Sequence, residues 1–303
     1  MTAITLLDGG LGQELVSRSA HPPHSLWGTY VMMEEPHILR EVHEEYFGVG
    51  ADVVTTNTYA IHPDRLQIID IEDRYEELHE TACRIAVEAR DATSKDGKIA
   101  GSLGPLGMSY RPDLAPEPEI AAEYYANMVR LHEPYVDIVL LETMCSVDQA
   151  DGALMGAKSG SKPVWLGISV DDKDGSHLRS GEPLSALEPI ITRHRPDAIL
   201  INCSIPEAVT TGLKHLSRFG VPFGGYANGF TEIASDFRRP GATVDLLTSR
   251  TDLGPKTYAN FCDDWVAAGA SIVGGCCEVG PAHIAEIQSR RAMNNQKTAG
   301  ASR

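Results

Sequence analysis

Positive charge is scarce in this chain. Its 303 residues include 26 lysines and arginines against 42 aspartates and glutamates, for a formal net charge of -16. A protein that binds nucleic acid needs a basic surface to offset the phosphates, and no basic stripe interrupts this acidic background. An acidic surface is also repelled by anionic membranes. Neither nucleic acid nor a membrane is therefore an expected partner.

Long apolar runs and cysteines are scarce as well. No segment approaches the roughly 20 consecutive apolar residues of a membrane helix. The N-terminus lacks the charged region and apolar stretch of a signal peptide. Six cysteines in a chain of this length do not make a disulfide scaffold. These absences predict a cytoplasmic protein whose cysteines serve metal binding or catalysis.

What the sequence does contain is a regular alternation of short apolar runs and helical patterns. Between the first two runs, for example, Ile38, Leu39, Val42, Tyr46 and Phe47 fall on one helical stripe. Eight strand–helix units in about 300 residues predict a single-domain (β/α)8 TIM barrel over residues 1–290, with an open doubly wound sheet as the alternative. The polar residues 291–303 are expected to form a flexible tail. The predicted strands are residues 4–8, 51–56, 98–101, 137–142, 163–170, 197–202, 222–226 and 270–274.

The unusual residues gather where these strands end, which in a barrel is the face that carries the chemistry. Cys203 follows the sixth strand, and the adjacent Cys276 and Cys277 follow the eighth. Three thiols at one end of a barrel would make a three-sulfur metal site with a fourth position open, an arrangement typical of catalytic zinc. The chemistry that this site favours is the activation of an incoming thiol. Taken singly, each cysteine could instead pack as a small apolar side chain.

Other residues of this face suggest how a substrate is held. Asp8 and Glu142 end the first and fourth strands, and a buried acid there needs a partner such as a ligand's ammonium group, or else an arginine or lysine. Asn228 could bind substrate or support the metal, although a turn role is also open. No lysine ends a strand, which argues against a Schiff-base aldolase. Cys83 and Cys262 lie on helical stripes and are expected in the core.

Seven segments together resemble the homocysteine S-methyltransferase family. This family includes S-methylmethionine- and betaine-dependent enzymes and the homocysteine module of cobalamin-dependent methionine synthase. The resemblance spans residues 4–290, and the segment around the paired cysteines is its most specific part. The segments are Leu7-Asp8-Gly9-Gly10 with Glu14, Ser25-Leu26-Trp27, Thr56-Asn57-Thr58-Tyr59, Gly101-Ser102-Leu103-Gly104-Pro105, Glu142-Thr143, Ile201-Asn202-Cys203 and Gly274-Gly275-Cys276-Cys277.

The resemblance implies a zinc-dependent methyltransferase on a (β/α)8 barrel. It implies that Cys203, Cys276 and Cys277 ligate Zn²⁺. It further implies that Asp8 and Glu142 hold the ammonium group of homocysteine and that Asn228 lies beside the metal. The methyl donor is expected to be an onium compound, S-methylmethionine or S-adenosylmethionine before betaine. Aromatic faces attract such cations, and the candidates are Trp27, which could instead pack in its loop, and Tyr59.

Two departures from the family pattern concern the cleft. Ala227 stands where proline is usual and is followed by Phe230, and Ser204-Ile205-Pro206 after the first zinc cysteine is unusual. Both are expected to touch the cleft and to alter the donor or acceptor. Three other functions stay open: a corrinoid-linked transfer with a separate protein partner, a non-catalytic zinc- or redox-sensing barrel, and an unrelated barrel lyase. Nothing in the sequence excludes a homo-oligomer.

Overall fold

Eight parallel strands form the centre of the computed structural model, which describes residues 4–93, 96–234, 237, 239 and 243–301. They are hydrogen-bonded in the order β1-β8-β7-β6-β5-β4-β3-β2, and a parallel bridge between Leu7 and Val53 joins the two ends. The predicted single-domain (β/α)8 barrel is confirmed. The strands are β1 (Thr5–Leu6), β2 (Val53–Thr55), β3 (Lys98–Leu103), β4 (Ile138–Met144), β5 (Val164–Ile168), β6 (Ala198–Asn202), β7 (Phe223–Tyr226) and β8 (Ile272–Val273).

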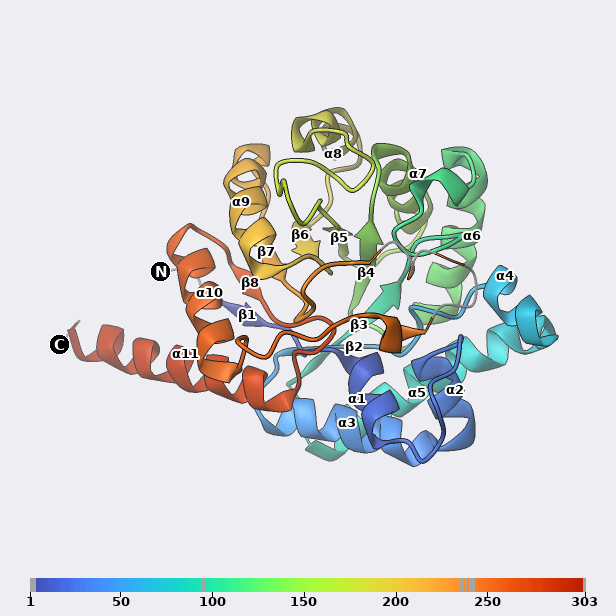
Figure 1. Ribbon diagram of the computed structural model, residues 1–303, viewed down its shortest axis with the longest axis horizontal. Coiled ribbons are helices and arrows are strands. Elements are labelled where there is room, and N and C mark those ends of the chain that lie inside the picture. Colours follow the sequence, from blue (N-terminus) through green and yellow to red (C-terminus); the bar gives the residue numbers. More distant parts are fainter. Residues whose placement is uncertain (1–3, 94–95, 235–236, 238, 240–242, 302–303) are drawn as a thin grey trace.

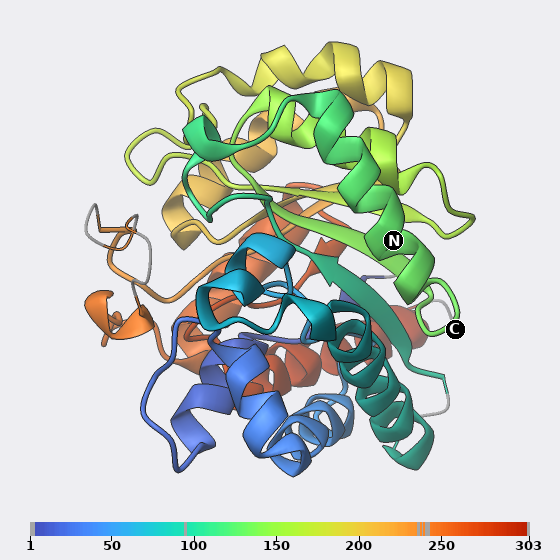
Figure 2. The same ribbon diagram turned by 90° about the vertical axis from the view of Figure 1, so that its right-hand side faces the viewer.

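The helices surround the strands, as Figures 1 and 2 show from two directions. Several begin at a proline, such as Pro36, Pro118 and Pro206, because proline fits the first helical position, where the missing N–H has no helical partner. They are α1 (Leu11–Arg18), α2 (Gly28–Glu34), α3 (Pro36–Gly48), α4 (Pro63–Leu66), α5 (Tyr75–Thr93), α6 (Pro118–His132), α7 (Val147–Ala157), α8 (Glu188–His194), α9 (Pro206–Leu216), α10 (Pro255–Ala267) and α11 (Pro281–Ala301).

The strands are buried on both faces, which explains their continuous apolar runs. In β4 every residue is buried. Its alternate residues Ile138 and Leu140 belong to a small cluster inside the barrel, whereas Val139 and Leu141 pack into the larger layer between strands and helices. The predicted stripe of α3 and the helical cysteines Cys83 and Cys262 are buried in that outer layer. This double packing fixes the strand ends, where the cavity described below lies.

Some strand limits differ from the predictions. β3 continues to Leu103 and β4 to Met144, so Glu142 lies inside its strand rather than at its last position. The register between β4 and β5 shifts between Leu141 and Met144, which lets the pairing continue past the expected end. An apolar run shows that a strand is present, but it does not show where the hydrogen-bonded ladder stops.

The segment after residue 290 also differs from the expected tail. It continues α11 as a helix to Ala301 (Figure 1). Arg291 donates to the carbonyl of Ile4 at 3.0 Å and pairs with Asp52. The segment is therefore helical as far as Ala301, and its flexibility stays a prediction. Within the described ranges, no helix is long and apolar enough to cross a membrane.

Candidate metal and substrate site

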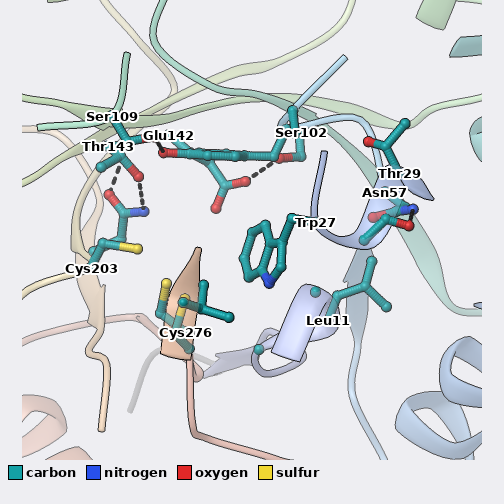
Figure 3. Close-up of a pocket in the computed structure, with 18 of the residues that line it drawn as sticks. Leu11, Trp27, Thr29, Asn57, Ser102, Ser109, Glu142, Thr143, Cys203 and Cys276 are labelled. Atoms are coloured by element: carbon teal, nitrogen blue, oxygen red, sulfur yellow. Dashed lines mark hydrogen bonds between the residues drawn. The ribbon is translucent and has the colours of Figure 1, made fainter. Parts of the chain in front are cut away.

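A cavity of about 370 Å³ lies at the end of the barrel where the strands finish. Seven of the eight strands, or the loops that directly follow them, contribute described residues to its lining. The cavity therefore lies on the face that the sequence predicted. Figure 3 shows Cys203 and Cys276 pointing into the same space, with Glu142 and Trp27 at its edges. Among the lining residues are Asp8, Trp27, Tyr59, Ser102, Tyr110, Glu142, Cys203, Tyr226, Phe230, Cys276 and Cys277.

Three sulfur atoms meet in this cavity. The thiols of Cys203, Cys276 and Cys277 lie within 4.8 Å of one another, and all three residues line the space. None of them is in a disulfide. A set of three thiols with one open side fits a metal ion that keeps its fourth position for a substrate. The predicted cluster is therefore formed, and it could hold a metal.

The three thiols are strongly coupled. Hydrogen bonds from Cys276 and then Cys277 lower the pKa of Cys203 well below its ordinary value. Hydrogen bonding to Cys203 is also the first cause that raises the pKa of Cys276 and of Cys277. Cys203 is therefore the thiol of the cluster that loses its proton most readily, and a divalent cation would favour the thiolate form of all three.

Close backbone packing places the paired cysteines. The amide of Cys276 donates to the carbonyl of Ala227 at 2.9 Å, and the amide of Gly229 donates to the carbonyl of Cys277 at 2.8 Å. On the other side, a Cβ added at Gly10 would lie 2.6 Å from the carbonyl oxygen of Cys276. Only glycine lets the β1 exit come this near, so the Gly9-Gly10 pair helps to place the cysteine cluster.

Two acids lie on the floor of the cavity. One oxygen of Asp8 accepts from the Thr55 amide at 2.7 Å and from its hydroxyl at 3.1 Å. Glu142 accepts from the Ser102 hydroxyl and, at 2.9 Å, from the hydroxyl of Tyr226. Burial is the first cause that raises the pKa of Asp8 well above its usual value and that of Glu142 to about 7.

Neither acid has a lysine or arginine partner among the described residues. The contributions to the two pKa values come from burial, hydrogen bonds and negative groups, and none comes from a cation. The sequence left open whether Asp8 and Glu142 form internal ion pairs, and that alternative is wrong. Two desolvated acids without a cation are poised for a positively charged ligand.

Aromatic side chains line the same space. The rings of Trp27 and Tyr59 meet edge to face with 6.3 Å between their centroids. The indole N–H of Trp27 donates to Gln13 at 3.0 Å, and the Tyr59 hydroxyl shares a 2.8 Å hydrogen bond with Ser109. Their polar atoms are thus occupied by protein groups, while both residues contribute to the cavity wall.

A sequence model of the homocysteine S-methyltransferase family matches residues 5–291. The chain belongs to this family. A homocysteine S-methyltransferase of Escherichia coli strain K12 is 27% identical over 312 residues, with 95% of each chain covered. The homocysteine S-methyltransferase YbgG of Bacillus subtilis is 28% identical over 306 residues, with 94% of this chain and 93% of the relative covered.

A solved structure of the family shares the fold over almost its full length. The homocysteine methyltransferase MmuM from Escherichia coli, in its metallated form, superposes with a TM-score of 0.77 at 26% identity. The match covers 95% of this chain and 96% of that one. A family member is therefore known with metal bound on the same barrel.

The departures from the family pattern lie mostly behind the cavity. Phe230 lines it, as expected, but Ala227 and Ser204 are fully buried and are not among the described lining residues. The N–H of Ala227, which a proline would lack, donates to the Tyr258 hydroxyl at 3.0 Å. The expectation that both departures touch the cleft is wrong for Ala227 and for Ser204-Ile205-Pro206. They shape the backbone that carries the cysteines.

Asn228 also lies outside the described cavity lining. The backbone N–H of Asn228 donates to the Ser204 carbonyl at 3.0 Å, and its side-chain oxygen accepts from the backbone N–H of Phe230 at 3.2 Å. The side-chain NH₂ is buried without a partner among the described residues. These contacts favour the turn role over direct substrate binding.

Two residues of the site received no predicted role from the sequence. Asn202 forms hydrogen bonds of 2.9 Å to the backbone N–H and hydroxyl of Thr143, which has a left-handed φ of 63°. Tyr110 also has a left-handed φ, 62°, and lines the cavity beside Cys203. Ordinary tyrosines, serines and asparagines in loops carry no sequence signal. The position of Asn202 at the end of β6 could have pointed to it, whereas Tyr110 lies within the loop that follows β3.

Proposed function

We propose that this chain transfers a methyl group from a small onium donor to the thiol of homocysteine, giving methionine. The observation that carries the proposal is the meeting of three cysteine sulfurs and two buried acids in one cavity. The sulfurs suit the activation of a thiol, and the acids suit the ammonium group of an amino acid. Family membership supports the same reaction.

Zinc is the metal that we assign to Cys203, Cys276 and Cys277. Tetrahedral zinc binds thiolates at about 2.3 Å, which separates its sulfur ligands by about 3.8 Å. The observed limit of 4.8 Å on the sulfur separations requires little movement to reach that geometry. When bound, zinc supplies the charge that keeps the homocysteine sulfur as a thiolate, whereas a free thiol has a pKa near 8.5.

The acceptor's ammonium group would lie between Asp8 and Glu142. Thr55 holds the first carboxylate, and Ser102 and Tyr226 hold the second, so neither needs to reorganise when the ligand arrives. The cation would replace the solvation that both acids lost on burial. Anchored there, homocysteine would present its sulfur to the cluster of Cys203, Cys276 and Cys277.

The donor would occupy the outer part of the cavity, where the faces of Trp27 and Tyr59 can attract a methylated cation. An onium donor loses its positive charge as the methyl group leaves, so the leaving thioether or amine departs as a neutral molecule. The chain therefore needs no general acid at this position. S-methylmethionine is our first choice, S-adenosylmethionine is next and betaine follows.

Arg65 supports a donor that carries a carboxylate, as all three of these do. It lines the outer cavity, and its guanidinium lies 5.7 Å from the centroid of the Tyr59 ring. Its guanidinium donates to the Pro105 carbonyl at 3.3 Å, and no carboxylate among the described residues pairs with it. A corrinoid delivered by a separate protein would leave this cation without an evident use.

The experiment is a comparison of donors on zinc-loaded protein. Homocysteine is supplied with S-methylmethionine, S-adenosylmethionine or betaine, and methionine is followed by chromatography, with chelator-treated protein as the control. We expect the highest kcat/KM with S-methylmethionine and no turnover without metal. Methionine formed only with an added methylcorrinoid protein would contradict the small-molecule donor. Bound zinc without methionine from any donor would contradict the reaction itself.

A further inference from the structure

A buried ion pair lies directly behind the metal site. The side chains of Arg179 and Asp172 are 3% and 10% exposed, and two N–H groups of the guanidinium donate to the two carboxylate oxygens at 3.0 and 3.1 Å. Neither residue belongs to the described cavity lining, so neither touches the substrates proposed above. Burying two charges carries a desolvation cost that their attraction often fails to offset. The contacts of this pair point to a specific use.

The pair forms hydrogen bonds at both ends of the turn that begins at Cys203, the first of the proposed zinc ligands. Arg179 donates to the carbonyl oxygen of Cys203 at 3.0 Å, and Asp172 accepts from the amide of Ile205 at 3.0 Å. A third group, the Ser169 hydroxyl, accepts from Nε of Arg179 at 2.7 Å and also approaches the Cys203 carbonyl at 3.3 Å. The guanidinium is therefore fixed in orientation as well as in position.

Cys203 needs such support because its backbone is left-handed. Its φ is 48°, a region that residues other than glycine, asparagine and aspartate seldom occupy without help from their surroundings. In this conformation its thiol comes within 4.8 Å of those of Cys276 and Cys277. Relaxation of the turn to an ordinary φ would swing the thiol away from the other two.

The same pair also reaches two loops that cover the sulfurs. The guanidinium lies 5.0 Å from the centroid of the Tyr110 ring, and Tyr110 packs in one buried cluster with Cys203 and Cys277. The second oxygen of Asp172 accepts from the amide of Ile233 at 3.3 Å. One ion pair thus ties the exits of β5 and β6 to the loops that follow β3 and β7.

We infer that Arg179, oriented by Asp172 and Ser169, is a positioning residue that sets the geometry of the metal site through the backbone of Cys203. It acts behind the ligand in the way that hydrogen-bond partners of metal ligands do, but through the main chain instead of the side chain. This inference rests on the proposed zinc site.

The test is the zinc affinity of reduced protein, measured by competition with a chromophoric chelator and without any substrate. Arg179→Met is expected to weaken zinc binding by about 10- to 100-fold, the usual effect of losing an outer partner of a metal ligand. Arg179→Lys should remain weak, because one ammonium supplies the charge but not the fork that reaches Asp172 and the carbonyl together. Cobalt(II)-substituted variants should show an altered absorption spectrum.

A matched control variant separates a change in the geometry of the metal site from a general loss of protein stability. Arg291→Met breaks another partly buried arginine–aspartate pair, to Asp52 at the start of β2, away from the cysteines. We expect that variant to lower the thermal unfolding temperature and leave zinc affinity unchanged. Should Arg179→Met fail to fold, Ser169→Ala removes one acceptor from the guanidinium and should weaken zinc binding in the same direction.

The outcomes are distinguishable. Wild-type zinc affinity in Arg179→Met, or full recovery in Arg179→Lys, would overturn the positioning role while leaving the zinc site in place. If Arg179→Met is unstable, unchanged zinc affinity in Ser169→Ala would also overturn the positioning role. Wild-type protein that binds no zinc at all would instead overturn the proposed function.

Discussion

At the scale of single residues, the site is built from groups whose burial or backbone conformation costs free energy when no ligand is bound. Asp8 and Glu142 are 2% and 9% exposed, and burial raises the pKa of both. Cys203 has a left-handed backbone, and its thiol lies within 4.8 Å of two others. A cationic amino group and a divalent metal would each relieve one of these costs. The ligands that we propose are those that the unliganded residues require.

The role of Asp8 predicts a selective kinetic effect. Asp8→Asn keeps the hydrogen bonds that Thr55 can make but removes the charge that faces the ammonium group. A hydrogen bond to a charged group contributes about 1.5–3 kcal/mol, so the KM for homocysteine should rise about 10- to 100-fold. The KM for the donor should change little and serves as the internal control. Steady-state kinetics with each substrate varied in turn decide this, and an unchanged homocysteine KM would remove Asp8 from the role.

At the scale of elements, the glycines that follow β1 let the ends of β1 and β8 approach each other. A Cβ at Gly10 would lie 2.6 Å from the carbonyl oxygen of Cys276 and 2.9 Å from the Cα of Cys277. These are backbone atoms that cannot rotate away, so the β1 exit and the β8 exit would have to separate. The two cysteines that follow β8 are thus placed partly by residues that carry no chemistry.

This packing predicts the effect of one added methyl group. Gly10→Ala should destabilise the protein by about 1–3 kcal/mol, the usual cost of overpacking, and should also weaken zinc binding. Gly48→Ala is the control, because a Cβ there meets nothing within 4 Å at the end of α3. Removing a helical glycine should stabilise by about 0.5–1 kcal/mol. Urea unfolding and chelator competition on both variants measure this; equal behaviour of the two would contradict it.

The sequence predicted which strands and helices are present better than it predicted where each one begins and ends. Apolar runs and helical stripes placed all eight strands, and strand ends located the cysteines, Asp8 and Glu142 on one face. The long-range contacts could not be read from any pattern. Arg179 lies in a loop after β5, and its contacts with Cys203 and Tyr110 exist only once three strand exits have met. The role of Asn228 was left open for a related reason, since its position after a strand does not reveal which way its side chain turns.

At the scale of the whole molecule, the barrel buries several histidines away from the site. His43 is fully buried in α3, and neither ring nitrogen has a hydrogen-bond partner in the described part of the chain. Burial lowers its pKa to about 3. Between that value and the ordinary pKa of 6.5, the unfolded chain binds a proton that the folded one does not. Stability is therefore present above pH 6.5 and is lost as the pH falls below it.

His43→Leu should flatten this pH dependence. At pH 5, about 1.5 pH units below the ordinary pKa, His43 alone lowers the free energy of unfolding by about 2 kcal/mol. The variant should reduce the difference in unfolding free energy between pH 8 and pH 5 by that amount, as measured with urea. His37→Leu, at an exposed position of the same helix, should leave the difference unchanged. A full pH dependence in His43→Leu would contradict the assignment.

The central claim is that three cysteines hold a zinc ion that serves methyl transfer to homocysteine. The most direct test is the zinc content of freshly purified, reduced protein, with methionine formation from homocysteine and S-methylmethionine followed on the same sample. We predict about one zinc per chain with methionine formed, the loss of both in Cys276→Ser, and the retention of both in Cys83→Ala, which alters a core cysteine of α5. Full zinc content with normal turnover in Cys276→Ser, or no zinc in wild-type protein never exposed to a chelator, would contradict the claim.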